Sequence, residues 1–352
     1  MSIYTIEKCK EEDLGLLIDF IKNHWKKDHI FVESEELLRF QHFNSSTKEF
    51  NFLIAKNNIT NEVDGVNGLI PLSQYDSELS KYNDTWGGIW KVRSDVNNHE
   101  TGLLGLFLFE EFKKYSSHGG AGLSNIAAKL IGKMRYNMCI INQYYIINNE
   151  VTDFKIASIP KKSIQSKKTI VESKFSIKEI QDISSISKKT VAAYYRPYKS
   201  LKYLVNRFQN HPIYKYSFLG IYNKVDILQT ILVVRAIEIN ESKVLRIVDV
   251  LGSLENLGSL KSCFQNILNE ELAEYIDFTN YGISIELIKS LGFEKLDVNK
   301  SIIIPNYFEP FVKENIIIQG CYKAKFDYSI FKADADQDRP SLQNKLHSDI
   351  IK

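Results

Sequence analysis

Cysteine is scarce in this sequence, and the spacing that zinc sites need is absent. The four cysteines lie far apart, so there is no Cys-x-x-Cys pair and no paired set of zinc ligands. Dispersed thiols without a secretion signal are typical of proteins in a reducing compartment. We therefore expect a cytoplasmic protein that holds no metal ion.

Long hydrophobic runs are also missing. The strongest apolar run, residues 102–109, is far too short for a helix that spans a membrane. The N-terminal stretch MSIYTIEKCKEEDLG carries charges where a signal peptide needs an apolar segment. The sequence thus predicts neither a membrane partner nor secretion.

Charge of one sign is not in excess either. The chain has 45 basic and 43 acidic residues, which gives a net charge of +2, whereas a protein that neutralises many phosphates needs a clear basic surplus. We expect no nucleic-acid partner, although one nucleotide or one coenzyme A (CoA) is compatible because each needs only a few donors. The sequence also lacks the Gly-x-Ser-x-Gly, His-Glu-x-x-His and P-loop motifs.

What the sequence does contain is a regular alternation of strands and helices. The length of 352 residues predicts about two domains. In the first half, apolar periodicity predicts strands at 2–9, 51–56, 66–72, 85–92, 119–123 and 138–147, and helices at 11–25, 34–43, 101–115 and 125–136. In the second half it predicts helices at 177–186, 200–208, 257–269 and 284–291, and strands at 218–223, 229–239, 243–252, 274–279 and 301–304.

The two halves end in the same order of elements, and a polar stretch at 156–168 separates them. We therefore predict an α/β (α+β) protein with two domains, residues 1–155 and 169–332, and a polar C-terminal tail at 333–352. Each domain is expected to be a mixed, mostly antiparallel sheet flanked by helices.

A strand, a polar turn and a glycine-containing helix start follow one another in residues 86–105, WGGIWKVRSDVNNHETGLLG. The unpaired N–H groups at such a helix start, together with the helix dipole, suit a diphosphate, and Gly102 and Gly105 allow close approach. The alternative is an ordinary turn in which the glycines serve packing.

This turn and the helix start at Asn125 resemble the GNAT acyltransferase superfamily, in which an Arg/Gln-x-x-Gly-x-Gly/Ala turn holds the CoA pyrophosphate. Here His99 stands where the Arg or Gln is usual, the last glycine is displaced by one, and Leu130 and Ile131 occupy the place of the usual acid Tyr. The resemblance implies acyl-CoA as donor and the following cofactor-binding residues: Val92, Arg93, Thr101, Gly102, Leu103, Leu104, Gly105 and Asn125.

For the chemistry, the resemblance implies attack of a neutral amine on the thioester. Backbone N–H groups at 91–94 are expected to polarise the thioester carbonyl. The nearest groups that could take the amine proton are Ser94, Asp95 and His99.

The second half lacks a regular glycine-containing turn of the kind seen at residues 99–105. It carries instead four polar and aromatic clusters: RFxxHPxYxY, EYIDF, IPNYFEPF and DxDQDRP. Glu255 in its turn would repel a pyrophosphate, so no second CoA site is expected. Each cluster has a structural alternative: a helix end, a cap, a turn between prolines, or a solvated tail. The DxDQDRP run lacks the glycine and distal Glu of an EF-hand loop.

These clusters resemble two-domain nucleotide-sugar N-acyltransferases such as those of the anthrose pathway. The resemblance implies transfer of an acyl group from acyl-CoA to the amine of a nucleotide-linked, dTDP-type amino-deoxy sugar in surface polysaccharide biosynthesis. The substrate-binding residues that it implies are Arg207, His211, Tyr216, Asp249, Asn280, Tyr281, Asn306, Glu309, Asp336 and Arg339.

Two other hypotheses stay open. A FemABX-type aminoacyl transferase also pairs two GNAT-like halves, but it needs a basic surface for tRNA and a long helical arm. A catalytically inactive GNAT pair that acts as a binding protein would explain the irregular glycine turn and the missing Tyr. The sequence does not define the oligomeric state.

Overall fold

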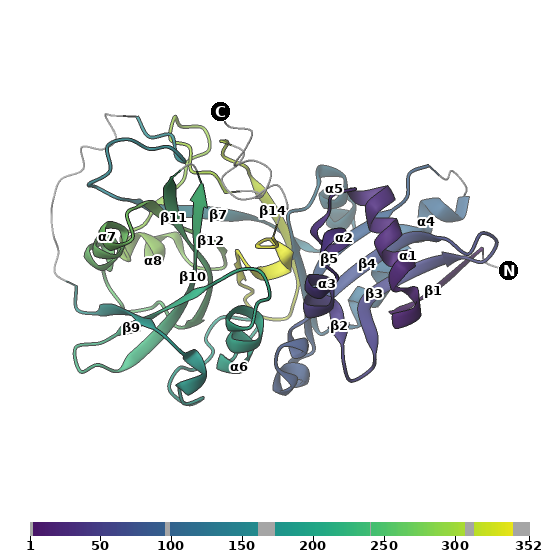
Figure 1. The fold of residues 1–352 in the computed structure, drawn as a ribbon, viewed down its shortest axis with the longest axis horizontal. Coiled ribbons are helices and arrows are strands. Elements are labelled where there is room, and N and C mark those ends of the chain that lie inside the picture. The colour runs from purple at the N-terminus through teal and green to yellow at the C-terminus, as the bar shows by residue number, and fades with distance from the viewer. Residues whose placement is uncertain (1–2, 96–98, 161–172, 240, 307–312, 341–352) are drawn as a thin grey trace.

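The computed structural model describes residues 3–95, 99–160, 173–239, 241–306 and 313–340, and within these residues the strands form a 15-stranded sheet that runs through the whole molecule (Figure 1). The main path of the sheet is β1-β3-β4-β5-β6-β14-β7-β12-β11-β10-β9-β8. The pairs β5–β6 and β11–β12 are parallel, and the other pairs along this path are antiparallel. The predicted α/β class, with a mixed and mostly antiparallel sheet, is confirmed.

The first half of the chain supplies one end of this sheet and the helices that flank it. Its strands are β1 (Tyr4–Lys10), β2 (Phe43–Asn44), β3 (Glu49–Asn57), β4 (Val63–Pro71), β5 (Asp84–Val92), β6 (Ser117–Ala121) and β7 (Asn137–Ile147). Its α-helices are α1 (Leu14–Phe20), α2 (Ile30–Glu33), α3 (Glu35–His42), α4 (His99–Glu110) and α5 (Asn125–Lys133).

The second half supplies the other end of the sheet. Its strands are β8 (Ser176–Ile180), β9 (Ser217–Tyr222), β10 (Leu228–Ile239), β11 (Ser242–Gly252), β12 (Ala273–Tyr281), β13 (Glu294–Lys295), β14 (Ile318–Lys323) and β15 (Ile330–Phe331). Its α-helices are α6 (Leu201–Leu204), α7 (Lys261–Glu270) and α8 (Ile285–Ser290). Residues 177–186, predicted as a helix, instead form β8 and a short 3-10 turn, because the alternating side chains of β8 pair with β9.

The two halves share strands. Residues 137–141 of β7 pair with β14, and residues 142–147 of the same strand pair with β12. Strand β14 comes from the second half but lies between β6 and β7 of the first. The predicted boundary between residues 155 and 169 therefore separates the halves along the chain but not in the sheet.

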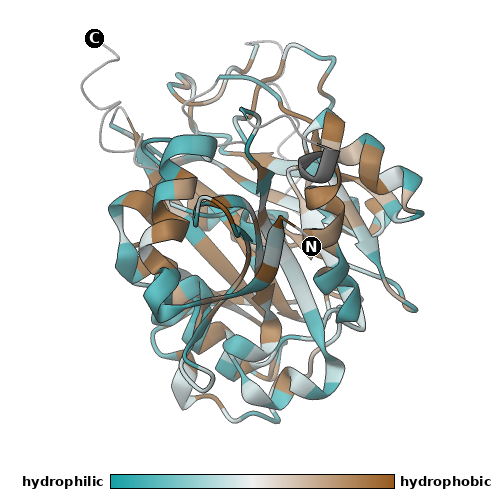
Figure 2. Ribbon diagram, turned by 90° about the vertical axis from the view of Figure 1, so that its right-hand side faces the viewer, coloured by the Kyte–Doolittle hydropathy of each residue, from teal (hydrophilic) through white to brown (hydrophobic). Residues whose placement is uncertain are grey.

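Apolar side chains form buried clusters between the sheet and its helices. Figure 2 shows hydrophobic residues along the strands, and helices that carry both hydrophobic and hydrophilic residues. One cluster of buried side chains belongs to both halves, since it joins Ile70 and Trp86 to Phe208, Ile231 and Val248. In the described part of the chain no helix combines the length and apolarity that crossing a bilayer requires.

Candidate functional site

The two parallel strands of the first half separate and leave a gap between them. Strand β5 pairs with β6 only over Asp84–Trp86, opposite 117–119. Opposite β4, Asn67 pairs with Trp90 but Leu69 pairs with Gly87, so β5 holds one extra residue at Gly88–Ile89. Such a bulge bends the strand and interrupts the regular ladder of hydrogen bonds.

A cavity of about 160 Å³, which we call the central cavity, lies at this gap. Both halves and the end of the described chain contribute to its wall. The lining residues are Trp25, Lys26, Asp28, His29, Ile30, Gly88, Ile89, Ala121, Gly122, Arg235, Arg246, Lys332 and Ala335–Pro340.

The end of the described chain, residues 333–340, packs between the halves and is anchored to both. Asp334 lies 2.8 Å from Lys199, and Asp338 lies 2.7 Å from Arg235. Asp336 accepts a hydrogen bond from Gln41 of the first half at 2.7 Å. The alternative of a solvated tail does not hold for these residues, because buried cations and amides hold their carboxylates. Residues 341–352 lie outside the described part of the chain.

The corresponding gap in the second half is filled by the protein itself. Strands β11 and β12 pair in parallel from Lys243 to Ile247. Beyond that point β15 pairs with the end of β12, and the N–H of Ala333 donates to the carbonyl of Val248 in β11 at 2.9 Å. A ligand cannot enter between these strands without displacing this segment, whereas the gap of the first half opens on the central cavity.

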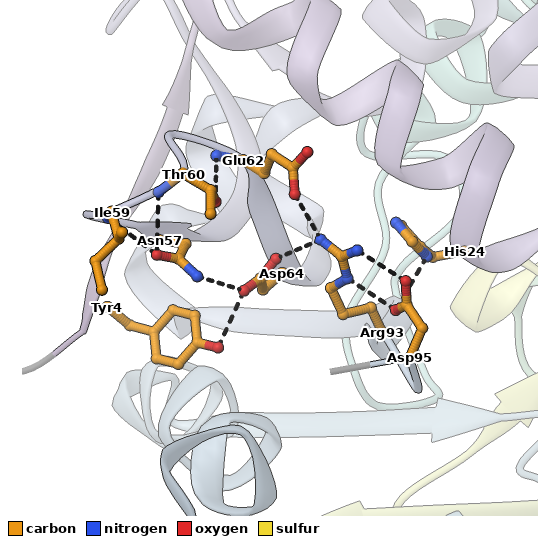
Figure 3. Close-up of polar contacts among 9 residues, drawn as sticks. All are labelled: Tyr4, His24, Asn57, Ile59, Thr60, Glu62, Asp64, Arg93 and Asp95. Atoms are coloured by element: carbon orange, nitrogen blue, oxygen red, sulfur yellow. Dashed lines mark hydrogen bonds and ion pairs between the residues drawn. The ribbon is translucent and has the colours of Figure 1, made fainter. Parts of the chain in front are cut away.

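Arg93, at the end of β5, is surrounded by carboxylates (Figure 3). Its guanidinium contacts Glu62 at 2.8 Å, Asp64 at 2.9 Å, and both oxygens of Asp95 at 2.8 Å. Asp64 is fully buried and also accepts a hydrogen bond from Tyr4 at 3.0 Å. The charge of Arg93, predicted to bind the cofactor, is therefore used to hold the turn that follows β5.

The same contacts bear on the predicted catalytic groups. The hydrogen bonds from Arg93 lower the pKa of Asp95, which makes this carboxylate a poor proton acceptor. Ser94 and Asp95 are exposed, and the N–H of Arg93 donates to the carbonyl of Asp64, so the irregular backbone lies at Gly88–Ile89 and not at 91–94. The roles of Ser94, Asp95 and His99 stay predictions; the side chains of His99, Thr101 and Gly102 lie outside the described part of the structure.

The remaining predicted cofactor residues lie around α4 and α5. Leu104 is buried and packs with half-buried Val92, whereas Leu103 is exposed. The carbonyl of Gly105 accepts a hydrogen bond from the Trp90 indole at 3.0 Å, which holds α4 against β5. Asn125 begins α5 and accepts a hydrogen bond from Gln319 at 2.8 Å.

Five predicted substrate residues gather around the 333–340 segment. Arg207 donates to the carbonyl of Ala333, and Tyr216 donates to Asp338 at 2.9 Å. A small cavity of about 20 Å³ beside the central one brings them together, since its lining includes Arg207, His211, Tyr216, Asp336 and Arg339.

The other predicted substrate residues lie elsewhere. Asp249 is buried against Lys199 at 2.7 Å, and burial raises its pKa. Asn280 is buried at the end of β12, and Tyr281 lies 3.3 Å from the hydroxyl of Tyr322. The side-chain amide of Asn306 donates a hydrogen bond to the carbonyl of Ile316 at 2.8 Å. Glu309 lies outside the described residues.

The residues of the central cavity that sequence analysis missed include four that could bind a ligand from its wall: His29, Arg235, Arg246 and Lys332. A signal existed for two of them, because Arg235 and Arg246 each interrupt an otherwise apolar strand, TILVVRAI and KVLRIVDV. A cation in such a strand is buried and must be paired. The structure pairs Arg235 with Asp338 and Arg246 with Asp277.

No protein-family model and no curated protein sequence matches this chain. Solved structures do. A GCN5-related N-acetyltransferase from Anabaena variabilis is similar over 91% of this chain and 72% of its own, with a TM-score of 0.53 and 11% identity. A conserved protein of unknown function from Enterococcus faecalis, named a probable N-acyltransferase, covers the same shares with a TM-score of 0.50 and 8% identity. These similarities show that the chain has the GNAT fold. Among the described residues no group of three or more His, Cys, Asp or Glu side chains is placed to hold a metal ion.

Proposed function

We propose that this protein is a CoA-dependent N-acyltransferase that binds acyl-CoA on its first half and the acceptor amine in the central cavity. The observation that carries the proposal is the contrast between the two gaps. The gap between β5 and β6 opens on a cavity, whereas the gap between β11 and β12 is filled by β15 and Ala333.

The first half has room for the donor. Strand β5 leaves β6 after Trp86, and Gly88 and Ile89, the next residues but one along the strand, line the central cavity. Helix α4 begins a few residues beyond the end of β5 and offers its N–H groups to a pyrophosphate. In this proposal the residues predicted around α4 and α5 bind CoA, while Arg93 holds the turn.

The chemical step balances without a side-chain acid. The amine nitrogen attacks the thioester carbonyl carbon, the C–S bond breaks, and the leaving thiolate takes up the proton that the amine loses. The protein contributes by holding the amine and the thioester in line and by polarising the carbonyl with backbone N–H groups near the bulge at Gly88–Ile89. Ser94, Asp95 and His99 stay the proposed side-chain alternatives for proton transfer, and Asp95 is the weakest of the three because Arg93 lowers its pKa.

For the acceptor we propose the amine of a nucleotide-linked amino sugar used in surface polysaccharide biosynthesis. The central cavity, at about 160 Å³, is small beside the range of about 300–1,000 Å³ typical of drug-sized ligands, so it suits the sugar end of such a molecule. The four cysteines are free, in keeping with the proposed cytoplasmic location.

Thermal unfolding with CoA, acetyl-CoA and dTDP tests the proposal. A ligand that binds only the folded state at about 100 times its Kd adds about 2.7 kcal/mol, which is a shift of several degrees. A thiol-release assay with amino-sugar acceptors then measures transfer, and Gly102→Trp should abolish it. The absence of any shift with CoA would contradict the proposal, and CoA binding without transfer to any amine would favour an inactive GNAT-like binding protein.

A further inference from the structure

His29 lines the central cavity, and one of its two ring nitrogens, Nδ1, is already used in a hydrogen bond. The side chain caps the start of α2, because its Nδ1 accepts the N–H of Phe31 at 3.2 Å. A neutral imidazole whose Nδ1 accepts carries its proton on Nε2. The ring is 3% exposed, and its Nε2 has no hydrogen-bond partner among the described residues.

The ring stays neutral over the whole physiological range. Burial lowers the pKa of His29 to about 2, and the positive charges of Arg339 and Lys26 lower it further. His29 is therefore not a proton acceptor for the reaction but a fixed N–H donor. A buried donor without a partner is costly, which points to a ligand atom that accepts its hydrogen bond.

The charges around this donor suit a negative ligand. The wall of the cavity carries five cationic side chains, Lys26, Arg235, Arg246, Lys332 and Arg339, against the three carboxylates of Asp28, Asp336 and Asp338, so its lining has a net positive charge. Each carboxylate of the wall is paired with a cation of the same wall: Asp338 with Arg235, Asp336 with Arg339, and Asp28 with Lys26 at 3.7 Å. A surplus of cationic side chains and the neutral ring of His29 thus line one space, an arrangement that favours an anionic oxygen.

We propose that His29 Nε2–H and the cationic wall of the central cavity bind an anionic oxygen group of the acceptor, a carboxylate or a phosphate. With this group bound, the acceptor's amine is the end that must reach the thioester beside Gly88–Ile89. The inference rests on the proposed acyl transfer and adds to it a substrate class: small compounds that carry both an amine and an anion.

Anion binding by the full-length protein, without CoA, tests the inference separately from the reaction. Inorganic phosphate and acetate are titrated by calorimetry against the wild type, His29→Asn and Ser34→Ala. Asn keeps a cap acceptor for α2 but has no donor at the Nε2 position. Ser34→Ala removes the neighbouring cap of α3, in which Ser34 accepts the N–H of Leu37, and controls for loss of helix stability.

We expect His29→Asn to weaken binding of the preferred anion at least tenfold and Ser34→Ala to leave it unchanged. Tighter binding of phosphate would indicate a phosphorylated acceptor, and tighter binding of acetate a carboxylated one. Equal affinity of the wild type and His29→Asn, or no anion binding by the wild type, would overturn the inference. Anion binding without thiol release from acyl-CoA would instead contradict the proposed function alone.

A second pair of variants tests the inference without changing His29, so its result does not depend on how the His29 substitution affects folding. Lys26 lines the cavity, whereas its neighbour Lys27 is exposed and outside the lining. Lys26→Met should weaken anion binding several-fold, and Lys27→Met should not. Equal effects of the two substitutions would show a general influence of surface charge and would also overturn the inference.

Discussion

The N–H of Ala333 donates to the carbonyl of Val248 at 2.9 Å, and this bond places the protein's own chain where the parallel strands of the second half diverge. Strand β15 closes the other side of the same gap through its pairing of Phe331 with Asn280. The two halves, alike in the order of their elements, are therefore unlike in what their gaps can accept.

This difference predicts the stoichiometry of the donor. Calorimetric titration with CoA should saturate at one molecule per chain, because only the first gap is open. Gly88→Leu, which places a large side chain at the bulge, should abolish this binding. A second equivalent of CoA, or binding that survives Gly88→Leu, would contradict the assignment of the donor to the first half.

The buried pair of Arg235 and Asp338 predicts a large loss of stability when one partner is removed. Both side chains are at most 5% exposed, so Asp338→Asn leaves a buried cation short of its partner. We expect the free energy of unfolding in urea to fall by about 3–5 kcal/mol. The exposed pair of Lys178 and Asp226 is the matched control, and Asp226→Asn should cost less than about 1 kcal/mol. Equal costs for the two substitutions would contradict this account.

Three buried histidines predict a loss of stability in mild acid. Burial lowers the pKa of His29 to about 2, of His42 to about 3 and of His118 to about 4, all below the value of about 6.5 expected in the unfolded chain. Between pH 7 and pH 5 the unfolded state therefore binds protons that the folded state does not, so stability falls as the pH falls. Each histidine should contribute about 1 kcal/mol by pH 5.5.

Urea unfolding at a series of pH values measures this slope. The ordinary carboxylates titrate near pH 4, below the window from pH 5 to pH 7. Within the window His211, whose pKa burial lowers to about 4, adds to the loss of stability. Asp249, whose pKa burial raises to about 6, takes up a proton in the folded state and offsets part of the loss, so a net fall is expected. A free energy of unfolding that does not fall between pH 7 and pH 5 would contradict this account of the buried histidines.

The cluster around Arg93 predicts that Asp95 is not the catalytic base. Asp95 is 56% exposed on its side chain and bound to Arg93, whereas Asp64 is almost fully buried. Asp95→Asn should lower kcat less than twofold and cost less than about 1 kcal/mol of stability. Arg93→Met should cost about 3 kcal/mol, because it leaves Asp64 without its cation. A general base would be revealed by a loss in kcat of about 100-fold or more in Asp95→Asn.

Much of the fold could be predicted from the sequence, because strands such as β5 and β11 have local apolar patterns and glycine or polar turns at their ends. Strand β14 could not, since the feature that makes it a strand is its place between β6 and β7, which no local pattern shows. The 333–340 segment is similar: Asp334, Asp336 and Asp338 are typical of a solvated run until their distant partners are known.

The candidate site likewise has one part that could be predicted from the sequence and one that could not. The helix start after β5 follows from glycines and a turn, but the central cavity is made by residues as distant as His29, Gly88, Arg235 and Lys332. His29 shows the limit most clearly, since its role depends on which ring nitrogen caps α2.

Strand β7 carries one further consequence. Because residues 137–141 of β7 lie against β14, a chain that ended at residue 155 would leave β6 and β7 as unpaired edges where β14 now sits. Bare strand edges invite pairing with other molecules. The first half on its own should therefore self-associate and precipitate, and the native protein avoids this by having its later residues complete its earlier sheet.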